Sequence, residues 1–228
     1  MRPTTTIGSI ECDAHSLEVA MPATMKIDYK RELRELYRPG REPQIVEVPD
    51  LAFVMIDGHG DPNTAPEFGE AVEALYTVAY SAKFAVKRGP EGADFAVMPL
   101  EGLFWAAGHS AFTSGDKASW DWTLMIMQPD QVTPEVFAEA RVAGAKRKSS
   151  AALAGVRLER YAEGLAAQVL HTGPYAAEAP TIERLHAFIA AHGYERAGKH
   201  HEIYLGDPRR SAPEKLRTIV RQPIAAAS

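Results

Sequence analysis

Residues 165–205 read LAAQVLHTGPYAAEAPTIERLHAFIAAHGYERAGKHHEIYL, and this stretch decides the fold. Residues 165–171 are rich in apolar side chains and predict a strand, which ends at the turn that begins with Gly173. Residues 181–192 carry apolar side chains at steps of three and four, which predicts a helix with one buried face. Residues 200–205 predict the next strand. The order is therefore strand, turn, helix, strand.

The preceding half of the chain repeats this order. Residues 44–48 and 51–56 are apolar or β-branched and predict strands, which a glycine-containing turn follows. Thr64 and Glu67 fit a capping box at the start of a helix with one apolar stripe. Residues 120–127 alternate and carry large side chains, which predicts a central strand.

Two such units predict an α+β fold. The repeats cover residues of about 44–130 and 157–224, and each is a βαββ unit. We expect pseudo-two-fold symmetry, antiparallel sheets and a ligand cleft between the two halves. Residues 25–228 then form a single domain, and residues 1–24 are expected to be a poorly ordered N-terminal extension.

The composition is typical of a packed globular protein and argues against several partners. The 228 residues are 46% hydrophobic and 24% charged, values close to the globular average. The formal net charge of -5 would repel the phosphates of a nucleic acid. Cys12, the single cysteine, forms neither an internal disulfide nor a cysteine-based zinc site. No apolar run approaches the roughly 20 residues of a membrane helix, so we expect a cytoplasmic protein with no membrane partner.

The sequence contains no convincing cofactor motif. Gly58-His59-Gly60 follows a predicted strand, but Asn63 stands where a dinucleotide fingerprint needs its third glycine. A phosphate-binding loop, the HExxH and CxxC metal motifs and the Gly-x-Ser-x-Gly nucleophile elbow are also absent. We therefore predict no cofactor.

His200-His201-Glu202 contains residue types that bind metal ions. On a strand, His200 and Glu202 share one face while His201 points to the other, and His171 on another strand could supply a third ligand. Structural histidines are the commoner explanation of such a pattern. The prediction is therefore that the protein holds no metal.

Glu202 is more informative about function as a carboxylate in a pocket than as a metal ligand. Tyr204 lies on the same side of the predicted strand, with Ile203 on the opposite side. If this side faces an aromatic pocket, burial would raise the pKa of Glu202 and improve it as a base near neutral pH. It would also attract a lipophilic cation. The alternative is that Glu202 is exposed on the surface of the sheet.

Aromatic side chains accompany this carboxylate along the chain. The strands of the first half carry several rings, Tyr175 follows the Gly173 turn, and Tyr204 is close to Glu202. A cage of rings around one acid would suit a flat hydrophobic aromatic ligand. The alternative is that most of these rings are ordinary core side chains. The residues predicted to contact the ligand are Phe104, Trp105, Trp122, His171 and Tyr175.

Several segments together resemble the GyrI-like small-molecule-binding proteins, in their stand-alone bacterial subgroup. The resemblance extends from about Met25 to Ile224. It implies two βαββ units around a pseudo-two-fold axis, with the ligand cleft between them. The matching segments are MKIDYKRELRELY, MIDGHGDPN, EAVEALY, MPLEGLFWA, WTLMIMQPD, HTGPY, PTIERLHAFI and KHHEIYLGDPRRSAPEKLRTIVRQPI.

The resemblance also implies an activity. A subfamily similar to this chain hydrolyses cyclopropane-bearing DNA-alkylating antibiotics of the yatakemycin type, which it binds in an aromatic cage. Glu202 matches the carboxylate typical of the family pocket and would be the general base. Tyr204 or Tyr175 would donate a hydrogen bond to the drug, and Trp105 and Phe104 would hold it. Many relatives are expected to have Trp at position 104, so the smaller Phe would reshape one wall of the cage.

Three functions follow from this resemblance. The first hypothesis is a hydrolase that detoxifies cyclopropane-bearing alkylators and so gives resistance to them. The second is a non-catalytic protein that sequesters lipophilic or cationic aromatic compounds. Inhibition of gyrase ranks lowest, so gyrase is not an expected partner. The absence of a recognisable DNA-binding domain argues against a complete transcription regulator, and homo-oligomerisation is left open.

Overall fold

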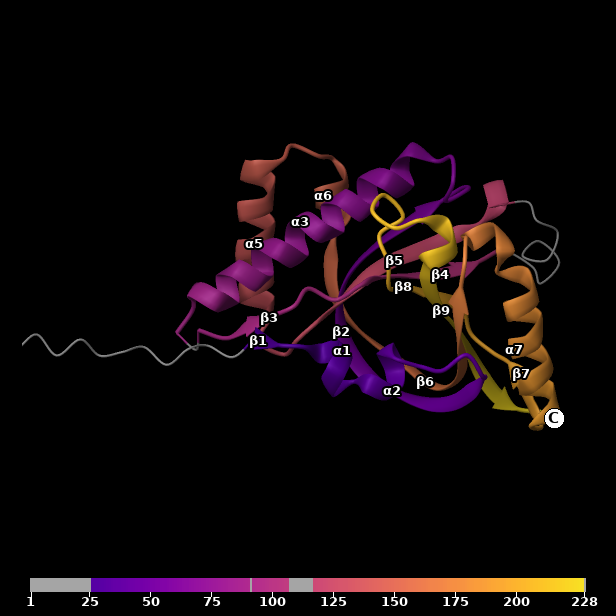
Figure 1. Ribbon diagram of the computed structural model, residues 1–228. Coiled ribbons are helices and arrows are strands. Elements are labelled where there is room, and N and C mark those ends of the chain that lie inside the picture. Colours follow the sequence, from indigo (N-terminus) through magenta and orange to yellow (C-terminus); the bar gives the residue numbers. More distant parts are fainter. Residues whose placement is uncertain (1–25, 91, 107–116, 228) are drawn as a thin grey trace, which may run out of the picture.

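A closed antiparallel sheet organises the protein (Figure 1). The computed structural model describes residues 26–90, 92–106 and 117–227. The strand order is β6-β2-β5-β4-β8-β9, and β6 also pairs with β9, so that six strands form a ring, with β7 added at the end of β9. The strands of this sheet are β2 (Gln44–His59), β4 (Leu100–Trp105), β5 (Asp121–Gln128), β6 (Arg157–Thr172), β7 (Tyr194–Arg196), β8 (His200–Tyr204) and β9 (Arg217–Ala226).

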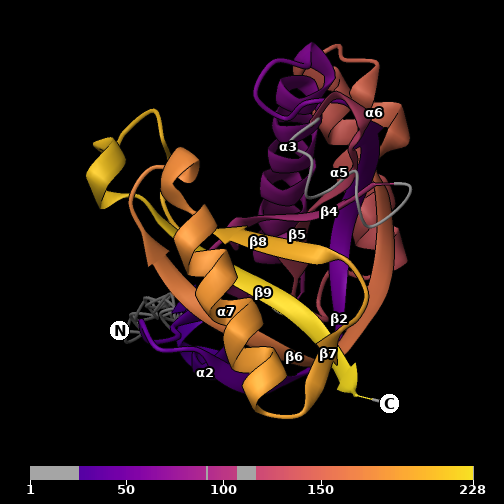
Figure 2. The same cartoon turned by 90° about the vertical axis from the view of Figure 1, so that its right-hand side faces the viewer.

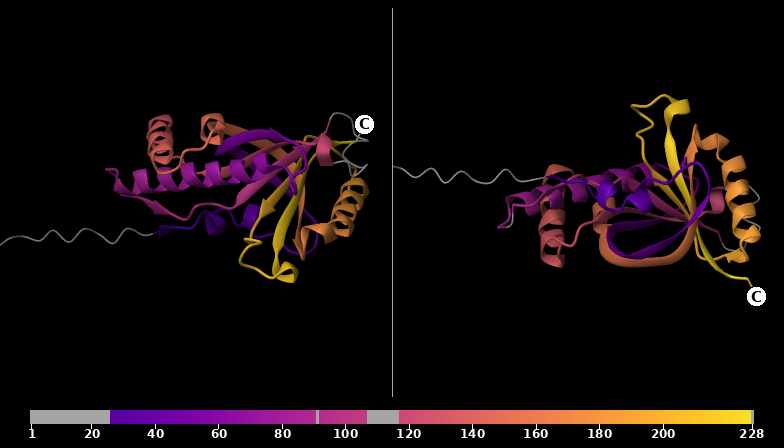
Figure 3. Two further views of the ribbon diagram at one scale, coloured as in Figure 1. Left: turned by 90° about the horizontal axis from the view of Figure 1, so that it is seen from above. Right: turned by 60° about the horizontal axis from the view of Figure 1, so that its bottom comes forward.

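Two long helices cover different parts of the outside of the ring (Figure 2). Helix α3 packs on β2 and β5, whereas α7 packs on β6 and β9. Helices α5 and α6 lie against α3, on the side away from α7 (Figure 3). The helices are α1 (Tyr29–Glu32), α2 (Arg34–Tyr37), α3 (Pro66–Arg88), α5 (Pro134–Arg147), α6 (Ala152–Gly155) and α7 (Ala179–Ala191), with short 3-10 turns η1 (Lys117–Ser119), η2 (Tyr175–Ala177) and η3 (Pro213–Lys215).

The N-terminal segment makes two sets of contacts, one with the segment after α3 and one with the core of the ring. Strand β1 (Lys26–Ile27) pairs in parallel with β3 (Asp94–Phe95), which follows α3. Lys83 of α3 donates to Asp94 at 2.7 Å. Helix α2 places Leu36 and Tyr37 in the core. These contacts join the segment to both the first helix and the ring.

The α+β class and the antiparallel pairing are confirmed, and the sheet is a single closed one. Each half contributes three strands to the ring, one long strand before its helix and two strands after it, and a short strand, β3 or β7, follows each helix. In this order, β2, β4 and β5 of the first half have neighbours that correspond to those of β6, β8 and β9 of the second half. Replacing β2 by β6, β4 by β8 and β5 by β9, and the reverse, therefore gives the same ring. The two-fold symmetry of the halves and the domain boundaries stay predictions. The predicted extension, residues 1–24, lies outside the described residues.

The first long helix begins later than its sequence pattern predicts. Helix α3 starts at Pro66 with Ala65 as N-cap, and no side chain caps it. The capping box predicted from Thr64 and Glu67 is therefore wrong. Proline has no N–H to satisfy in the first turn, so it begins a helix without a capping side chain. Most of the predicted apolar stripe of α3 is buried, namely Leu75, Ala79, Ala82 and Val86, whereas Phe68 and Val72 are partly exposed.

Trp122 fixes the spacing between α3 and the sheet. Its side chain is 1% exposed and its ring meets Phe68 of α3 edge-on, with 5.2 Å between ring centroids. Gly58 lies opposite Trp122 in the β2–β5 pairing. A Cβ atom at position 58 would overlap the indole ring. The absence of a side chain at this position is therefore what lets the indole lie flat against the sheet.

The inner face of the ring, opposite to the face that α3 and α7 cover, holds a buried polar network. His201 contacts Glu101 through Nε2 at 3.0 Å and Glu163 through Nδ1 at 2.9 Å. Arg221 donates to Glu163 at 3.1 Å, and the hydroxyl of Tyr37 donates to Glu101 at 2.7 Å. Burial alone would raise the pKa of Glu163, but His201 and Arg221 outweigh it and hold that pKa at about 2. The network joins β4, β6, β8, β9 and α2.

Replacing Gly58 tests the close approach of the indole. We expect Gly58→Ala to lower the free energy of unfolding by about 1–3 kcal/mol, because the added methyl displaces Trp122 from a packed site. Gly69→Ala is the control, since a Cβ at that helical position meets nothing within 4 Å and alanine favours a helix by about 0.5–1 kcal/mol over glycine. Urea unfolding measures both changes. Equal effects of the two substitutions would contradict this explanation.

The inner network predicts a pH-dependent stability. Glu163→Gln removes the charge between His201 and Arg221, and we expect a loss of about 3–5 kcal/mol at pH 7. The folded pKa of Glu163, about 2, lies below its unfolded value, so its contribution is full above the unfolded pKa and declines as the pH falls toward 2. The difference between variant and wild type should thus be smaller at pH 4 than at pH 7 in urea unfolding. Glu159→Gln, at an exposed pair with Arg157, should cost less than about 1 kcal/mol.

Candidate functional site

A large cleft lies on the outer face of the ring between α3 and α7. Its volume is about 1650 Å³. Strands β4 and β8 are adjacent at the centre of the sheet, and the two helices cover the strands on either side of them. The outward side chains of β4 and β8 therefore form its floor, namely Leu100, Phe104, His200, Glu202 and Tyr204.

On this floor, Glu202 has a hydrogen-bonding partner for each of its two carboxylate oxygens. Its Oε1 lies 3.1 Å from Nε2 of His200, and its Oε2 accepts a hydrogen bond from the hydroxyl of Tyr204 at 2.8 Å. The Glu202 side chain keeps 16% of its exposure, so a ligand in the cleft can reach it. Side chains of a β-strand alternate between its two faces. His200 and Tyr204, two residues before and after Glu202, therefore lie on the same face as this carboxylate.

These partners change the expected ionisation of Glu202. Burial alone would raise its pKa, which was the prediction from the sequence. The hydrogen bonds from His200 and Tyr204 outweigh burial and hold the pKa of Glu202 below its usual value. The predicted direction is therefore wrong, and the group is a carboxylate at neutral pH.

Tyr204 positions Glu202 and is not free to donate to a ligand. Its hydroxyl proton is used in the 2.8 Å hydrogen bond to the carboxylate. Burial, followed by the charge of Glu202, raises the pKa of Tyr204 well above its usual value. Tyr175 meets the Tyr204 ring edge-on, with 5.6 Å between centroids. Of the two tyrosines predicted as donors to a ligand, Tyr175 is therefore the better placed.

A second carboxyl group, Glu178, lines the same cleft. It precedes helix α7 and is 4% exposed. Burial and then the neighbouring Glu202 raise the pKa of Glu178 to about 8. Sequence analysis did not identify Glu178. Its interaction partner, Glu202, lies in the distant strand β8, and no local sequence pattern distinguishes Glu178 from an exposed glutamate. The cleft therefore contains two interacting carboxyl groups rather than one.

Four of the predicted site residues come together in the cleft, whose lining includes Phe104, Tyr175, Glu202 and Tyr204. Trp105 is not part of this lining. It follows Phe104 on strand β4 and so points to the opposite face, where Nζ of Lys199 lies 3.4 Å from its ring centroid. The prediction placed both rings in one cage, which the alternation of a strand does not allow.

Trp122 and His171 share the outer face of the sheet but are also outside the cleft lining. Helix α3 covers Trp122 through Phe68. His171 is 6% exposed, and its Nδ1 lies 3.0 Å from the hydroxyl of Thr181 in α7. Both side chains are covered by the helices that flank the cleft.

Further aromatic and charged residues complete the walls. Phe68, Tyr76 and Tyr80 come from one side of α3, at spacings of eight and four residues, which repeat along one helix face. Trp120 lies 6.0 Å from Phe104 between ring centroids. The apolar stripe predicted for this helix included Phe68, whereas Tyr76 and Tyr80 were not identified from the sequence. Basic side chains that also line the cleft are Lys30, Lys117, Arg147, Lys148, Arg196, Arg209 and Arg210.

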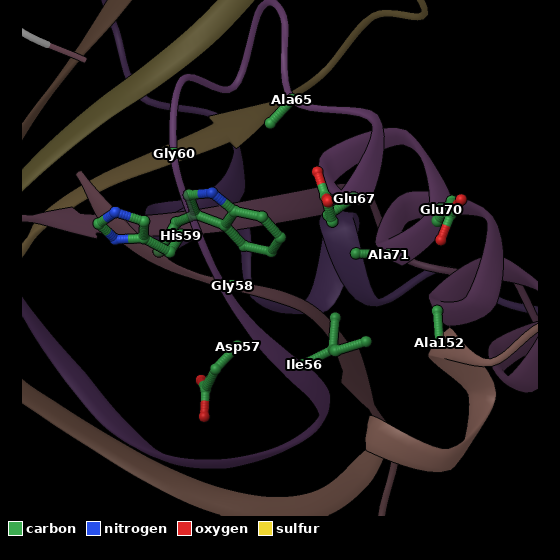
Figure 4. A pocket seen from close by; sticks show the side chains of 11 residues that line it. Ile56, Asp57, Gly58, His59, Gly60, Ala65, Glu67, Glu70, Ala71 and Ala152 are labelled. Atoms are coloured by element: carbon green, nitrogen blue, oxygen red, sulfur yellow. The ribbon is translucent and has the colours of Figure 1, made fainter. Parts of the chain in front are cut away.

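A second pocket lies at the other side of α3 and is smaller, about 600 Å³ (Figure 4). It is lined by the segment from Ile56 to Gly60 and by Glu67 and Glu70 of α3. His59 is exposed and contacts Asp121 at 2.9 Å. Its acidic side chains are exposed as well, whereas the large cleft contains the buried Glu178 and the largely buried Glu202. The large cleft is therefore the candidate site.

Within residues 26–90, 92–106 and 117–227, no three His, Cys, Asp or Glu side chains are grouped as the ligands of a metal ion would be. In the part of the chain that the structure describes, no helix combines the length and apolar character required to cross a membrane.

Comparisons with known proteins agree with this architecture. The profile of the GyrI-like small molecule binding domain matches residues 41–225. An uncharacterized conserved protein from Listeria innocua is 40% identical, with a TM-score of 0.81, over 88% of this chain and 100% of that one. A structure described as a hydrolase from Listeria innocua is 38% identical, with a TM-score of 0.77 and the same coverage.

A more distant structure shares the fold alone. The C-terminal domain of EcmrR is 11% identical, with a TM-score of 0.51, over 82% of this chain and 98% of that one. A comparison with curated protein sequences finds no match.

The hydrogen bond from Tyr204 can be tested by titration. We expect Tyr204→Phe to raise the pKa of Glu202, because the phenylalanine cannot donate to the carboxylate. Carbon-13 NMR of the glutamate carboxyl groups measures the titration. Tyr194→Phe, in β7 and outside the cleft lining, is the matched control and should leave it unchanged. An unaltered Glu202 titration in the Tyr204 variant would contradict the assigned role.

Proposed function

The chain belongs to the GyrI-like family of small-molecule-binding domains, and we propose that it hydrolyses cyclopropane-bearing DNA-alkylating antibiotics of the yatakemycin type, which would give resistance to them. The observation that carries this proposal is Glu202, an accessible carboxylate with two hydrogen-bonding partners on the floor of an aromatic cleft. The similar Listeria innocua protein described as a hydrolase supports catalysis in this part of the family.

The cleft suits a flat, mostly apolar compound. Its volume of about 1650 Å³ exceeds the roughly 300–1,000 Å³ of common ligand pockets. Rings from both walls line it, including Tyr76 of α3 and Tyr175 of η2. Aromatic faces favour stacking on planar ligands. The cage that we propose is therefore formed by Phe68, Tyr76, Phe104, Trp120 and Tyr175.

The proposed reaction opens a strained ring with water. A cyclopropane fused to a cyclohexadienone becomes a phenol when one of its carbon–carbon bonds breaks. Glu202 takes one proton from water while the oxygen of that water bonds to the cyclopropane carbon. The electron pair of the broken bond enters the ring, which becomes aromatic, and negative charge develops on the former carbonyl oxygen. A hydrogen-bond donor near this oxygen lowers the barrier.

His200 and Tyr204 give Glu202 a defined role in this step. They fix both carboxylate oxygens, so the carboxylate is oriented before the drug binds. They also lower its basicity, which limits the proton transfer that Glu202 can drive. A base of this kind contributes about 10²–10⁴-fold. Relief of ring strain and gain of aromaticity in the drug supply the remaining driving force.

Sequestration without chemistry is the second candidate. An ionised Glu202 surrounded by aromatic faces is also a site for a lipophilic cation, through charge and cation–π attraction. The observation that favours this alternative is the pKa of Glu202, which is held below its usual value by His200 and Tyr204 although burial opposes this. A permanent carboxylate serves a cation better than it serves proton abstraction.

Product analysis separates the two candidates. We expect the purified protein to convert a yatakemycin-type cyclopropanoid, over many turnovers, to a product heavier by one water, as detected by mass spectrometry. Glu202→Gln should lower kcat by about a hundredfold or more, because the amide cannot accept the proton. Glu139→Gln, at an exposed position of α5, is the matched control and should retain full turnover.

Two results would contradict parts of this proposal. If the drug binds and is recovered unchanged, the cleft only sequesters it. If Glu202→Gln turns over at the wild-type rate, hydrolysis occurs but Glu202 is not its base.

A further inference from the structure

Helix α7 presents a histidine to the large cleft. His186 lies one turn after Ile182, and both residues line the cleft, as expected for positions i and i+4 on one helix face. The Nδ1 atom of His186 lies 3.5 Å from a guanidinium nitrogen of Arg196 in β7. Its Nε2 atom is buried and has no hydrogen-bond partner in the described part of the chain. The imidazole ring therefore has one nitrogen in use and one without a partner.

The contact with Arg196 determines which ring nitrogen carries the proton. A guanidinium group only donates hydrogen bonds, so Nδ1 of His186 must accept, and the proton of the neutral ring then lies on Nε2. Burial, followed by the charge of Arg196 and by His200, lowers the pKa of His186 to about 4. The ring is therefore neutral at pH 7, and its Nε2 is a hydrogen-bond donor.

This donor lacks an acceptor that a ligand can supply. A buried N–H group without a partner is unfavourable, and His186 belongs to the wall of a cleft. Water does not compete for a covered nitrogen, so an acceptor placed beside it gains the full hydrogen bond. The second side-chain torsion of a histidine has broad minima. A modest turn of the ring therefore brings Nε2 to the cleft surface at low cost.

His186 acts at the same part of the cleft as the proposed base. It interacts electrostatically with His200, whose Nε2 lies 3.1 Å from Glu202. The hydroxyl proton of Tyr204 is already committed to Glu202. The floor of the cleft thus offers an acceptor, and the wall formed by α7 offers a donor.

We propose that the Nε2–H group of His186 donates a hydrogen bond to the carbonyl oxygen of the bound substrate and stabilises the charge that develops there. His186 is then a catalytic residue beside Glu202, and this inference rests on the proposed hydrolysis. Its geometric support is the buried, unpartnered Nε2 in the cleft wall, together with the Arg196 contact that leaves the proton on this atom. Other enzymes also use a neutral imidazole to polarise a carbonyl group.

The proposed step balances in atoms and charge. One proton of water passes to Glu202, and the remaining hydroxide forms a carbon–oxygen bond at the cyclopropane carbon. The strained carbon–carbon bond breaks, and its electron pair makes the ring aromatic. The former carbonyl oxygen becomes a phenolate, which the N–H group of His186 stabilises without losing its proton. The phenolate then takes a proton from solvent, Glu202 returns its proton to solvent, and no oxidant or reductant is needed.

The donor also restricts the class of substrate. A compound with a carbonyl oxygen conjugated to its strained ring satisfies Nε2 of His186, and it does so more strongly as negative charge reaches that oxygen. A lipophilic cation without an acceptor would leave this N–H group unpaired. We therefore expect turnover only of compounds in which the strained ring is conjugated to a hydrogen-bond acceptor.

Two substitutions of His186 test this role. We expect His186→Leu to lower kcat by about 10²–10³-fold, because it removes one donor to the developing oxyanion. KM should change by no more than a few-fold. His186→Gln places an amide N–H group near the position of Nε2 and should recover at least about tenfold of this loss, which a merely structural role would not predict. His192→Leu, at the exposed C-cap of α7 and outside the cleft lining, is the matched control and should retain full turnover.

A second measurement needs no variant. Its probe is an unreactive analogue of the drug, in which two methyl groups replace the cyclopropane and the dienone carbonyl is kept. Nitrogen-15 NMR of the wild type should show His186 with its proton on Nε2, and binding of the analogue should shift the resonance of that proton. Infrared spectroscopy should show the carbonyl band of the bound analogue at lower frequency than in an apolar solvent. If His186→Leu does not fold, these spectra still decide the matter. A proton on Nδ1, or an Nε2 proton that the analogue does not affect, would overturn the inference.

The outcomes distinguish this inference from the proposed function. If the wild type hydrolyses the drug and His186→Leu retains its kcat, the inference fails while the hydrolase assignment stands. If the wild type and His192→Leu bind the drug equally and return it unchanged, the proposed function fails, and the catalytic role of His186 fails with it.

Discussion

The position of His201 between two buried acids is the constraint on which the site depends. Its ring nitrogens lie 3.0 Å from Glu101 and 2.9 Å from Glu163, so β8 is tied to β4 and to β6 from the inner face. Burial alone would lower the pKa of His201, but Glu163 and Glu101 raise it. A shift of β8 by one residue would turn His201 outward and Glu202 inward. The inner network therefore fixes the register that presents Glu202 to the cleft.

The open floor of the cleft depends on Gly102. This residue is paired with Glu202 across the β4–β8 contact, and a Cβ there would lie 2.7 Å from the ring of Phe104. Without a side chain at 102, the Phe104 ring lies over the strand and leaves the carboxylate accessible. The flanking helices stop at β5 and β9. The cleft is thus the part of the outer sheet that neither helix covers.

The sequence predicted the parts of this site that depend on local periodicity. Alternation along 200–204 correctly put Glu202 and Tyr204 on one side and His201 on the other. The same alternation places Trp105 and Phe104 on opposite faces of β4. The prediction that both rings contact one ligand did not take this alternation into account. Trp122 could not be assigned from alternation alone. Trp122 does lie on the outer face with Phe104, but α3 covers it through Phe68. The packing of a helix on a strand distant in the sequence cannot be inferred from neighbouring residues.

Glu178 was not predicted because its contact with Glu202 joins elements that are distant in the sequence. Its environment shows how the outer face of the sheet differs from the inner face. On the inner face, acidic and basic side chains are paired within hydrogen-bond distance, so each proton is held where the fold needs it. On the outer face, Glu178 interacts with another acid, Glu202, as well as with Thr218. Pairing of opposite charges stabilises the ionised forms on the inner face, whereas the neighbouring like charge of Glu202 raises the pKa of Glu178 on the outer face. Because both arrangements meet at β8, the strand whose inner face is held by His201 also presents the Glu202 carboxylate to the cleft.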